Sequence, residues 1–102
     1  MNLNYEPERI YSVDQNHKVV AEVTFPEIRD GIVDINHTFV DDSLRGQGVA
    51  SRLLEETAKI LRTEGKRAVL TCSYAKSWFA RHKEFSDILV SDNPANADQL
   101  ER

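Results

Sequence analysis

The stretch from residue 32 to residue 72 constrains the fold of this chain more than any other part of its sequence. An apolar segment at 32–40 leads through a glycine-bearing turn at 45–50 into a helical pattern, which ends near Glu64. A second apolar segment follows at 67–72. Within the helical pattern, apolar residues recur every three or four positions: Val49, Leu53, Leu54, Ala58 and Leu61. Two strands joined by a long helix run parallel, because the chain must cross back over the sheet. The order predicts an α/β (α+β) fold.

Shorter patterns predict the elements around this unit. Residues 9–13 and 18–25 alternate in polarity and predict an antiparallel hairpin, with Pro26 ending its second strand. Ser73 is expected to cap a second helix that reaches residue 82 or 83, and a last apolar patch follows at 85–90. We expect one domain over residues 1–90, followed by a loose polar tail at 91–102.

The segment 32–40 carries apolar residues at both alternating sets of positions. Strands of this kind are covered on both faces, so the pattern predicts a single central strand. His37 falls on the face that also carries Val33, Ile35 and Phe39. The same placement leaves open that His37 is a packed core histidine.

Composition excludes several classes of function. The chain of 102 residues has a net charge of −4, which argues against a nucleic-acid partner. Its one cysteine, Cys72, and three scattered histidines make neither a disulfide framework nor a metal site. A free thiol favours the cytoplasm. No apolar run is long enough to cross a membrane, and the first residues do not resemble a secretory signal.

The turn at 45–50 has the features of an anion site. A helix N-terminus presents free N–H groups, and Gly46 and Gly48 would let a phosphate approach the backbone closely. Arg45 adds a charged fork that suits a phosphate. A Walker loop is absent, and the string from Gly46 to Ser51 narrowly misses a dinucleotide fingerprint, for which the chain is too short. The alternative is a helix that begins at a flexible turn and binds nothing.

The string Arg45-Gly46-Gln47-Gly48-Val49-Ala50 resembles the cofactor motif of the GNAT acetyltransferase superfamily, Arg/Gln-x-x-Gly-x-Gly/Ala. The segments His37-Thr38-Phe39-Val40 and 72–79 look like those of its small YJDJ-type branch. The resemblance covers residues 9 to about 90. It implies a minimal GNAT fold, in which the parallel strands splay apart where the thioester lies. It also implies an acetyl-CoA-dependent N-acetyltransferase.

The resemblance further implies a role for each part of the motif. Backbone N–H groups from Gly46 to Ser51 would hold the diphosphate of coenzyme A. The strand end at Thr38, Phe39 and Val40 would pair with the pantetheine arm, and Phe79 would form part of the cofactor wall unless it belongs to the core. The acceptor would be an amine of a small molecule, protein or peptide, and the chain would act as a monomer or weak homodimer.

The sequence departs from larger family members in two ways. It lacks room for the helices that follow the first strand and build the acceptor pocket, so an open and shallow acceptor site is expected. The Phe-Tyr pair usual in the last helix is Trp78-Phe79 here, which removes the tyrosine that commonly protonates the leaving thiolate. The catalytic role must then fall on other side chains.

Three side chains are the candidates for catalysis. Cys72 precedes a predicted helix N-terminus, which lowers the pKa of a thiol, so it could carry the acetyl group or protonate coenzyme A. His37 is the best general base by type, ahead of Asp34 and Glu22. Tyr74 could hydrogen-bond the cofactor or replace the missing acid. For each of the three, a side chain that only packs in the core or at its edge is the alternative.

Two further functional classes stay open at this point. The chain could be a module that binds coenzyme A and transfers nothing. It could also be a small structural or interaction protein, whose glycine turn serves only the fold. Lys76 and Arg81 could reach the extra phosphate of the nucleotide, although exposed helix cations are usually just solvated.

Overall fold

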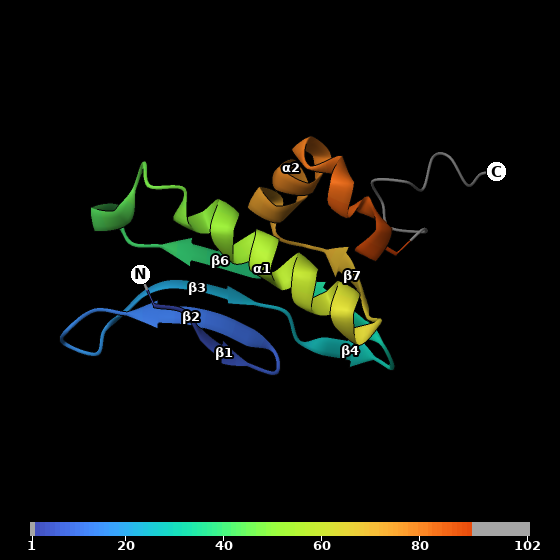
Figure 1. The fold of residues 1–102 in the computed structure, drawn as a ribbon, viewed down its shortest axis with the longest axis horizontal. Helices are drawn as coiled ribbons and strands as arrows, with labels where there is room; N and C mark the ends of the chain where they lie inside the picture. Colours follow the sequence, from blue (N-terminus) through green and yellow to red (C-terminus); the bar gives the residue numbers. More distant parts are fainter. Residues whose placement is uncertain (1, 91–102) are drawn as a thin grey trace.

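Two small sheets form the body of the protein, and they share one continuous segment of chain (Figure 1). The computed structural model describes residues 2–90. The first sheet is antiparallel and has the order β1 (Asn4–Glu6), β2 (Arg9–Val13), β3 (Val19–Thr24) and β6 (His37–Val40). The second has the order β4 (Glu27–Arg29), β5 (Ile32–Ile35) and β7 (Arg67–Leu70).

The predicted hairpin is confirmed as β2 and β3. Its turn is held by the Asp14 side chain, which accepts from the backbone N–H groups of Asn16 and Lys18. His17 lies in this turn with a φ of 66°. The strands β1 and β4 were not predicted, because each has only three residues, all exposed, and so shows no apolar alternation.

The prediction of one central strand over 32–40 is wrong, because a bulge at Asn36 divides it into β5 and β6. Asn36 donates to the Thr24 carbonyl oxygen (3.2 Å), and His37 is also the register partner of Thr24. Asn36 and His37 thus both lie opposite Thr24, and the extra residue switches the side of the sheet to which the later side chains point. Ile35 is buried, whereas Phe39 is 38% exposed. The β6 strand is therefore not covered on both faces.

The same bulge gives the two halves different partners. β5 pairs in parallel with β7, as the strand-helix-strand order predicts, while β6 pairs antiparallel with β3. β7 ends at Leu70, two residues earlier than predicted. Past that point, the N–H groups of Thr71 and Cys72 both approach the Ile35 carbonyl oxygen at 3.2 Å. The two sheets diverge there, which leaves a gap between β6 and the chain that follows β7.

The long helix α1 (Val49–Glu64) matches its predicted length and ends at Gly65, whose φ is 71°. The helix α2 (Ser73–Arg81) has Cys72 as its N-cap and shows no side-chain cap bond, so the prediction that Ser73 caps it is wrong. Two short 3₁₀ helices, η1 (Asp42–Leu44) and η2 (Lys83–Ile88), complete the fold. η2 contains Phe85 and Ile88 of the predicted last apolar patch.

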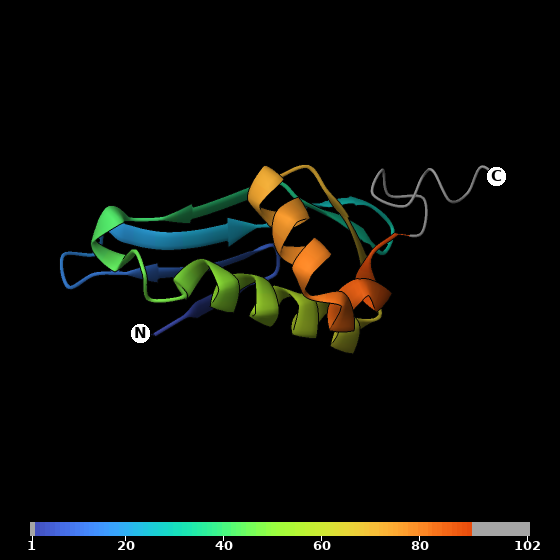
Figure 2. The ribbon, with the colours of Figure 1, turned by 90° about the horizontal axis from the view of Figure 1, so that it is seen from above.

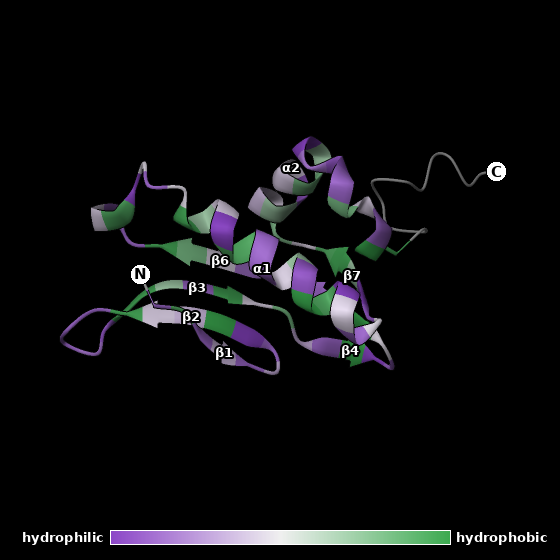
Figure 3. Ribbon diagram, viewed as in Figure 1, coloured by the Kyte–Doolittle hydropathy of each residue, from purple (hydrophilic) through white to green (hydrophobic). Residues whose placement is uncertain are grey.

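One core joins the two sheets. α1 crosses both of them with its apolar side against the strands (Figure 3), and α2 and η2 pack against its two ends. Figure 2 shows that the helices lie on one side of the strands, and the other side carries no helix within residues 2–90. No helix in this part of the chain is long and apolar enough to cross a membrane. The predicted tail, 91–102, lies outside the described residues.

Candidate active site

The turn before α1 has the backbone shape that its glycines predict. Gly46 and Gly48 have φ values of 80° and 71°, in the left-handed region that other residues rarely adopt. A Cβ atom added at either position would meet nothing within 4 Å. Conformation rather than crowding therefore requires glycine here, and the space in front of the turn is open.

The first turn of α1 faces a hollow of about 230 Å³. No side chain caps Gly48, and the Arg52 N–H donates to the Gly48 carbonyl oxygen (3.0 Å) as the helix begins. The N–H groups of the first turn thus lack intrahelical partners, as at any helix start. The hollow is lined by Val40, Leu44, Arg45, Gly46, Gly48, Val49, Ala50, Ser51 and Tyr74. Leu44 was not predicted, because a single apolar residue in a polar turn gives no signal.

Two aspartates make hydrogen bonds or ion pairs within the loop that leads into this turn. Asp41 accepts from the N–H and hydroxyl of Ser43, and these bonds hold the pKa of the Asp41 carboxyl below its ordinary value. Arg45 forms an ion pair with Asp42 (Nε–Oδ1 3.0 Å), and both side chains are largely exposed. The Arg45 guanidinium is therefore held at the rim of the hollow and has further N–H groups free of this pair.

The edge of β6 that faces the gap carries unused backbone groups. The Asp41 N–H donates to the Val20 carbonyl oxygen (2.8 Å), which marks a hydrogen-bonded pair. Such pairs alternate along an antiparallel ladder, so Phe39 also bonds to β3, whereas Thr38 and Val40 point their backbone groups away from it. No described strand pairs with this edge. Since Val40 also lines the hollow, the edge leads directly to the turn of α1.

Cys72 lies across the gap from this edge. Its Sγ is 3.6 Å from Oγ1 of Thr38, which is the contact that bridges the two diverging sheets. Cys72 is half-buried and sits at the N-cap of α2. The structure thus brings the predicted catalytic thiol to the predicted pantetheine strand.

His37 lies elsewhere. It neighbours Thr38 in the strand, so its side chain points to the opposite face of the sheet, where it is 53% exposed. Its Nε2 is 3.7 Å from a Glu22 oxygen, and Arg9 pairs with the same carboxylate. The packed core histidine considered above is therefore excluded, and His37 is not grouped with Cys72.

The remaining candidates divide between the hollow and the core. Tyr74 is 37% exposed and lines the hollow. Phe79 is 3% exposed, packs edge-to-face on Trp78, and does not line the hollow. Gln47 is exposed and does not line it either. Asp34 accepts a hydrogen bond from the Thr71 hydroxyl (2.7 Å).

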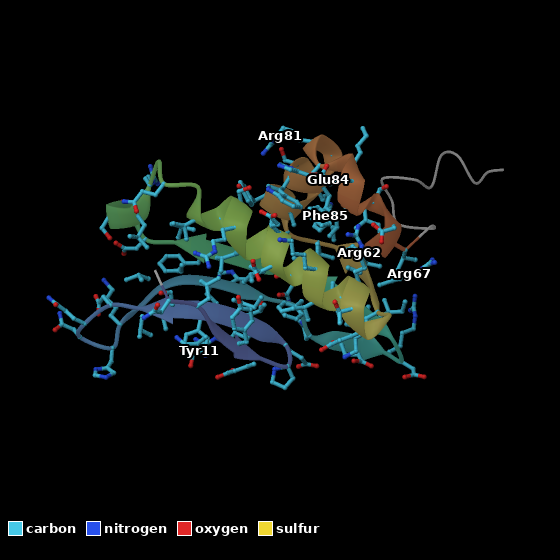
Figure 4. All side chains as sticks on the ribbon, viewed as in Figure 1. Tyr11, Arg62, Arg67, Arg81, Glu84 and Phe85 are labelled. Atoms are coloured by element: carbon cyan, nitrogen blue, oxygen red, sulfur yellow. The ribbon has the colours of Figure 1, made fainter. Side chains whose placement is uncertain are left out.

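Side chains on α2 beyond Tyr74 are mostly exposed or committed to the fold. Arg81 donates to the Ser77 hydroxyl (2.7 Å) and lies at the outer surface of α2 (Figure 4). Lys76 is exposed. Across residues 2–90, no three histidine, cysteine, aspartate or glutamate side chains gather in a way that could hold a metal ion.

Comparisons with known proteins agree with this architecture. The family model for GCN5-related N-acetyl-transferases matches residues 9–88. A GCN5-like protein from Staphylococcus aureus, solved by NMR, is 26% identical with a TM-score of 0.74, and the match covers 87% of each chain. Among curated proteins, no sequence matches the chain.

Two larger structures share part of the fold. A GNAT-family N-acetyltransferase from Escherichia coli, solved in complex with CoA, is 25% identical with a TM-score of 0.52; the match covers 61% of this chain and 38% of that one. An acetyltransferase from Bacillus cereus is 27% identical with a TM-score of 0.52, and the match covers 61% of this chain and 44% of that one. The predicted GNAT fold is confirmed, while the YJDJ-type branch stays a prediction. The chain belongs to the GCN5-related N-acetyltransferase family, and at that general level it is an acyltransferase that uses an acyl-CoA donor and an amine acceptor.

Proposed function

We propose that this protein transfers the acetyl group of acetyl-CoA to an amine. The observation that carries the proposal is that two sets of unpaired backbone groups, one at the edge of β6 and one at the first turn of α1, border the same hollow. The edge suits a linear amide chain, which can pair with it as an added strand would. The turn suits a diphosphate, since N–H groups and the helix dipole meet there. Pantetheine joined to a diphosphate has both parts in this order.

The parts of the donor would then lie as follows. The diphosphate takes the backbone N–H groups between Gly46 and Ser51, with Arg45 at the rim. The pantetheine amides pair with Thr38 and Val40. The thioester comes to the gap beside Cys72, whose Sγ lies 3.6 Å from Oγ1 of Thr38. Acetyl is the acyl group that the resemblance of the motif at 45–50 to GNAT acetyltransferases implies.

The reaction requires one bond to form and one to break. The amine nitrogen attacks the thioester carbonyl, the C–N bond forms, the C–S bond breaks, and coenzyme A leaves as a thiolate. The amine loses a proton to a base, and the thiolate gains one from an acid. Cys72 is the acid in this proposal, because its thiol lies beside the strand edge to which we assign the pantetheine arm.

His37 is the proposed base for an amine that approaches from the outer face of the sheet. That face carries no helix within the described residues, and the Nε2 of His37 lies 3.7 Å from a Glu22 oxygen. Tyr74 lines the hollow and would hydrogen-bond the cofactor. Since Cys72 is a free thiol, we place the enzyme in the cytoplasm. We further propose that it acts as a monomer or weak homodimer.

A thermal shift with acetyl-CoA tests the proposal first. A ligand that binds only the folded chain raises Tm by mass action, so ~1 mM acetyl-CoA should give a clear increase. Absence of any increase would contradict the proposal and favour a structural role for the glycine turn. Turnover with a panel of small amines, polyamines and lysine peptides comes next. Stabilisation without turnover of any of these would instead favour a coenzyme A-binding module.

A mass measurement separates two roles of Cys72. If Cys72 carries the acetyl group, protein mixed with acetyl-CoA and no amine gains the mass of one acetyl group. If Cys72 acts as an acid, the mass stays unchanged while turnover with amine proceeds. We expect the second result.

A further inference from the structure

Ser51 is joined to the second helix by a half-buried hydrogen bond. It is the third residue of α1 and lines the hollow. The indole Nε1–H of Trp78 donates to its Oγ at 2.7 Å, across 27 positions of sequence. Trp78 is 1% exposed, so the indole N–H has no access to water as an alternative partner. This bond connects the first turn of α1 to the middle of α2.

The bond controls where the Ser51 hydroxyl proton can point. A serine hydroxyl has one hydrogen to donate and two lone pairs to accept with. The indole N–H occupies a lone pair, which turns the hydroxyl hydrogen away from Trp78. Within residues 2–90, no hydrogen bond from this hydroxyl to another group is found. The hydrogen therefore remains available on the side of the hollow.

Trp78 is held in place from several directions. The His82 ring stacks on it at 3.9 Å with an interplanar angle of 13°, and His82 Nδ1 lies 2.8 Å from the Trp78 carbonyl oxygen. Phe79 meets it edge-to-face at 4.9 Å, and Phe85, from η2, stacks on it at 5.8 Å. An indole packed in this way has one orientation, so the hydroxyl it bonds is oriented before any ligand arrives.

The helix that carries Trp78 also supplies a side chain to the hollow. Tyr74 lies one turn before Trp78 and therefore on the same face of α2. α2 also begins at Cys72, beside the gap between the sheets. One short helix thus contacts both ends of the proposed cofactor site.

We infer that Trp78 is a positioning residue for the diphosphate site: it orients the Ser51 hydroxyl so that its proton is donated to a cofactor phosphate. The inference rests on the proposed function, because it requires a phosphate in the hollow. Ser51 is the residue that touches the cofactor, and Trp78 acts through it. α2 therefore contributes to the affinity for coenzyme A through Trp78, and it places Cys72 at the thioester end of the cofactor.

A double-mutant cycle on coenzyme A affinity tests the inference. Ser51→Ala should raise the Kd for coenzyme A about tenfold, since a hydrogen bond to a charged group is lost. Trp78→Phe keeps a buried ring but removes the N–H, and it should raise Kd about threefold to fivefold. The double variant should match Ser51→Ala alone, because Trp78 has no route to the cofactor without the hydroxyl. The KM for acetyl-CoA should follow Kd, with kcat unchanged.

Three controls separate positioning from mere packing. Phe85→Leu disturbs the same aromatic cluster without touching Ser51, so it should lower Tm and leave Kd unchanged at a temperature well below Tm. Ser51→Thr retains a hydroxyl and should restore most of the affinity. Pantetheine lacks the diphosphate, so its Kd should be equal for wild type and Trp78→Phe. Trp78 is the only tryptophan, so its fluorescence in wild type should change when coenzyme A binds.

The outcomes distinguish this inference from the function on which it rests. If wild type binds coenzyme A and Trp78→Phe binds it equally well, the inference is overturned and the proposed function stands. If Trp78→Phe and Ser51→Ala weaken binding additively, Trp78 acts by another route and the inference is again overturned. If wild type does not bind coenzyme A at all, the proposed function fails and the inference fails with it.

Discussion

The two faces of the central segment, β5 and β6, are built in different ways. On the side of α1 and α2, the proposed donor site consists of backbone groups, two left-handed glycines and side chains fixed by a buried core. On the outer face, where we propose that the amine approaches, His37, Glu22 and Arg9 form an exposed or half-exposed charged group. Backbone groups alone can bind a diphosphate and an amide chain, whereas deprotonation of an amine requires a side-chain base. A short chain can therefore preserve the donor site completely and leave the acceptor side open.

Cys72 lies at the junction of the two sides, and its removal should have the largest effect. Cys72→Ala should lower kcat about 1000-fold, within the range that general acids contribute, while the Kd for coenzyme A changes less than about threefold. Steady-state kinetics and calorimetry check both values. Thr38→Val, which removes only the partner of the thiol, should cost far less rate. A fully active Cys72→Ala enzyme with intact folding would show that the thiol is only packed.

The outer face is probed by His37. His37→Asn should lower kcat/KM for the amine about 100-fold near pH 7 and alter the pH profile of kcat/KM, because the general base is lost. The Kd for coenzyme A should stay the same, because the side chain points away from the donor side. His17→Asn, in the hairpin turn, is the matched control and should change neither value. An unaltered pH profile in His37→Asn would remove His37 as the base.

Substitutions at the two glycines that flank α1 test the donor site. Gly48 and Gly65 flank α1 with the same φ of 71°, and a Cβ atom at either meets nothing within 4 Å. Alanine at either position should destabilise the fold similarly, by about 1 kcal/mol. Only Gly48→Ala should also raise the Kd for coenzyme A, by about tenfold, because only Gly48 borders the hollow. Equal Kd values for the two variants would show that the turn serves the helix and not a ligand.

The smallest expected effect concerns the loop that leads into the donor site. Bonds from Ser43 depress the pKa of Asp41 in the folded chain, so the stabilisation is present above its ordinary value of 3.8 and is lost as the pH falls through the lower folded value. Asp41→Ala should lower Tm by a few degrees at pH 7 and by progressively less as the pH falls toward 3. It should also weaken coenzyme A binding about twofold to threefold.

Asp14→Ala is the matched control for Asp41→Ala. Asp14 accepts two backbone N–H groups in the hairpin turn and does not line the hollow in front of α1. Its loss should lower Tm and leave the Kd for coenzyme A unchanged. Weaker binding in Asp14→Ala would mean that loss of stability, rather than loss of loop order, explains the effect of Asp41→Ala.

Most of the donor site was predictable from sequence because its determinants are local. The glycines at 46 and 48, the helical period that follows and Gly65 each act within a few residues of where they stand. The residues of the turn accordingly line the hollow, apart from Gln47. Short exposed strands such as β1 lack the alternation that marks a strand, so they were missed. The outward orientation of His37 was not predicted, because strict alternation along 32–40 places its side chain on the same face as the buried Val33 and Ile35.

The sequence by itself determined the strand-helix-strand unit, its parallel crossover and the open helix start, since these follow from periodicity, glycine conformation and chain connectivity. Tertiary structure alone decided the bulge at Asn36, which turns His37 outward and parts the two sheets. It also decided the contacts of Cys72 with Thr38 and of Trp78 with Ser51, which join residues 34 and 27 positions apart. No local pattern encodes such pairs, because each forms only when separate elements pack against a common core.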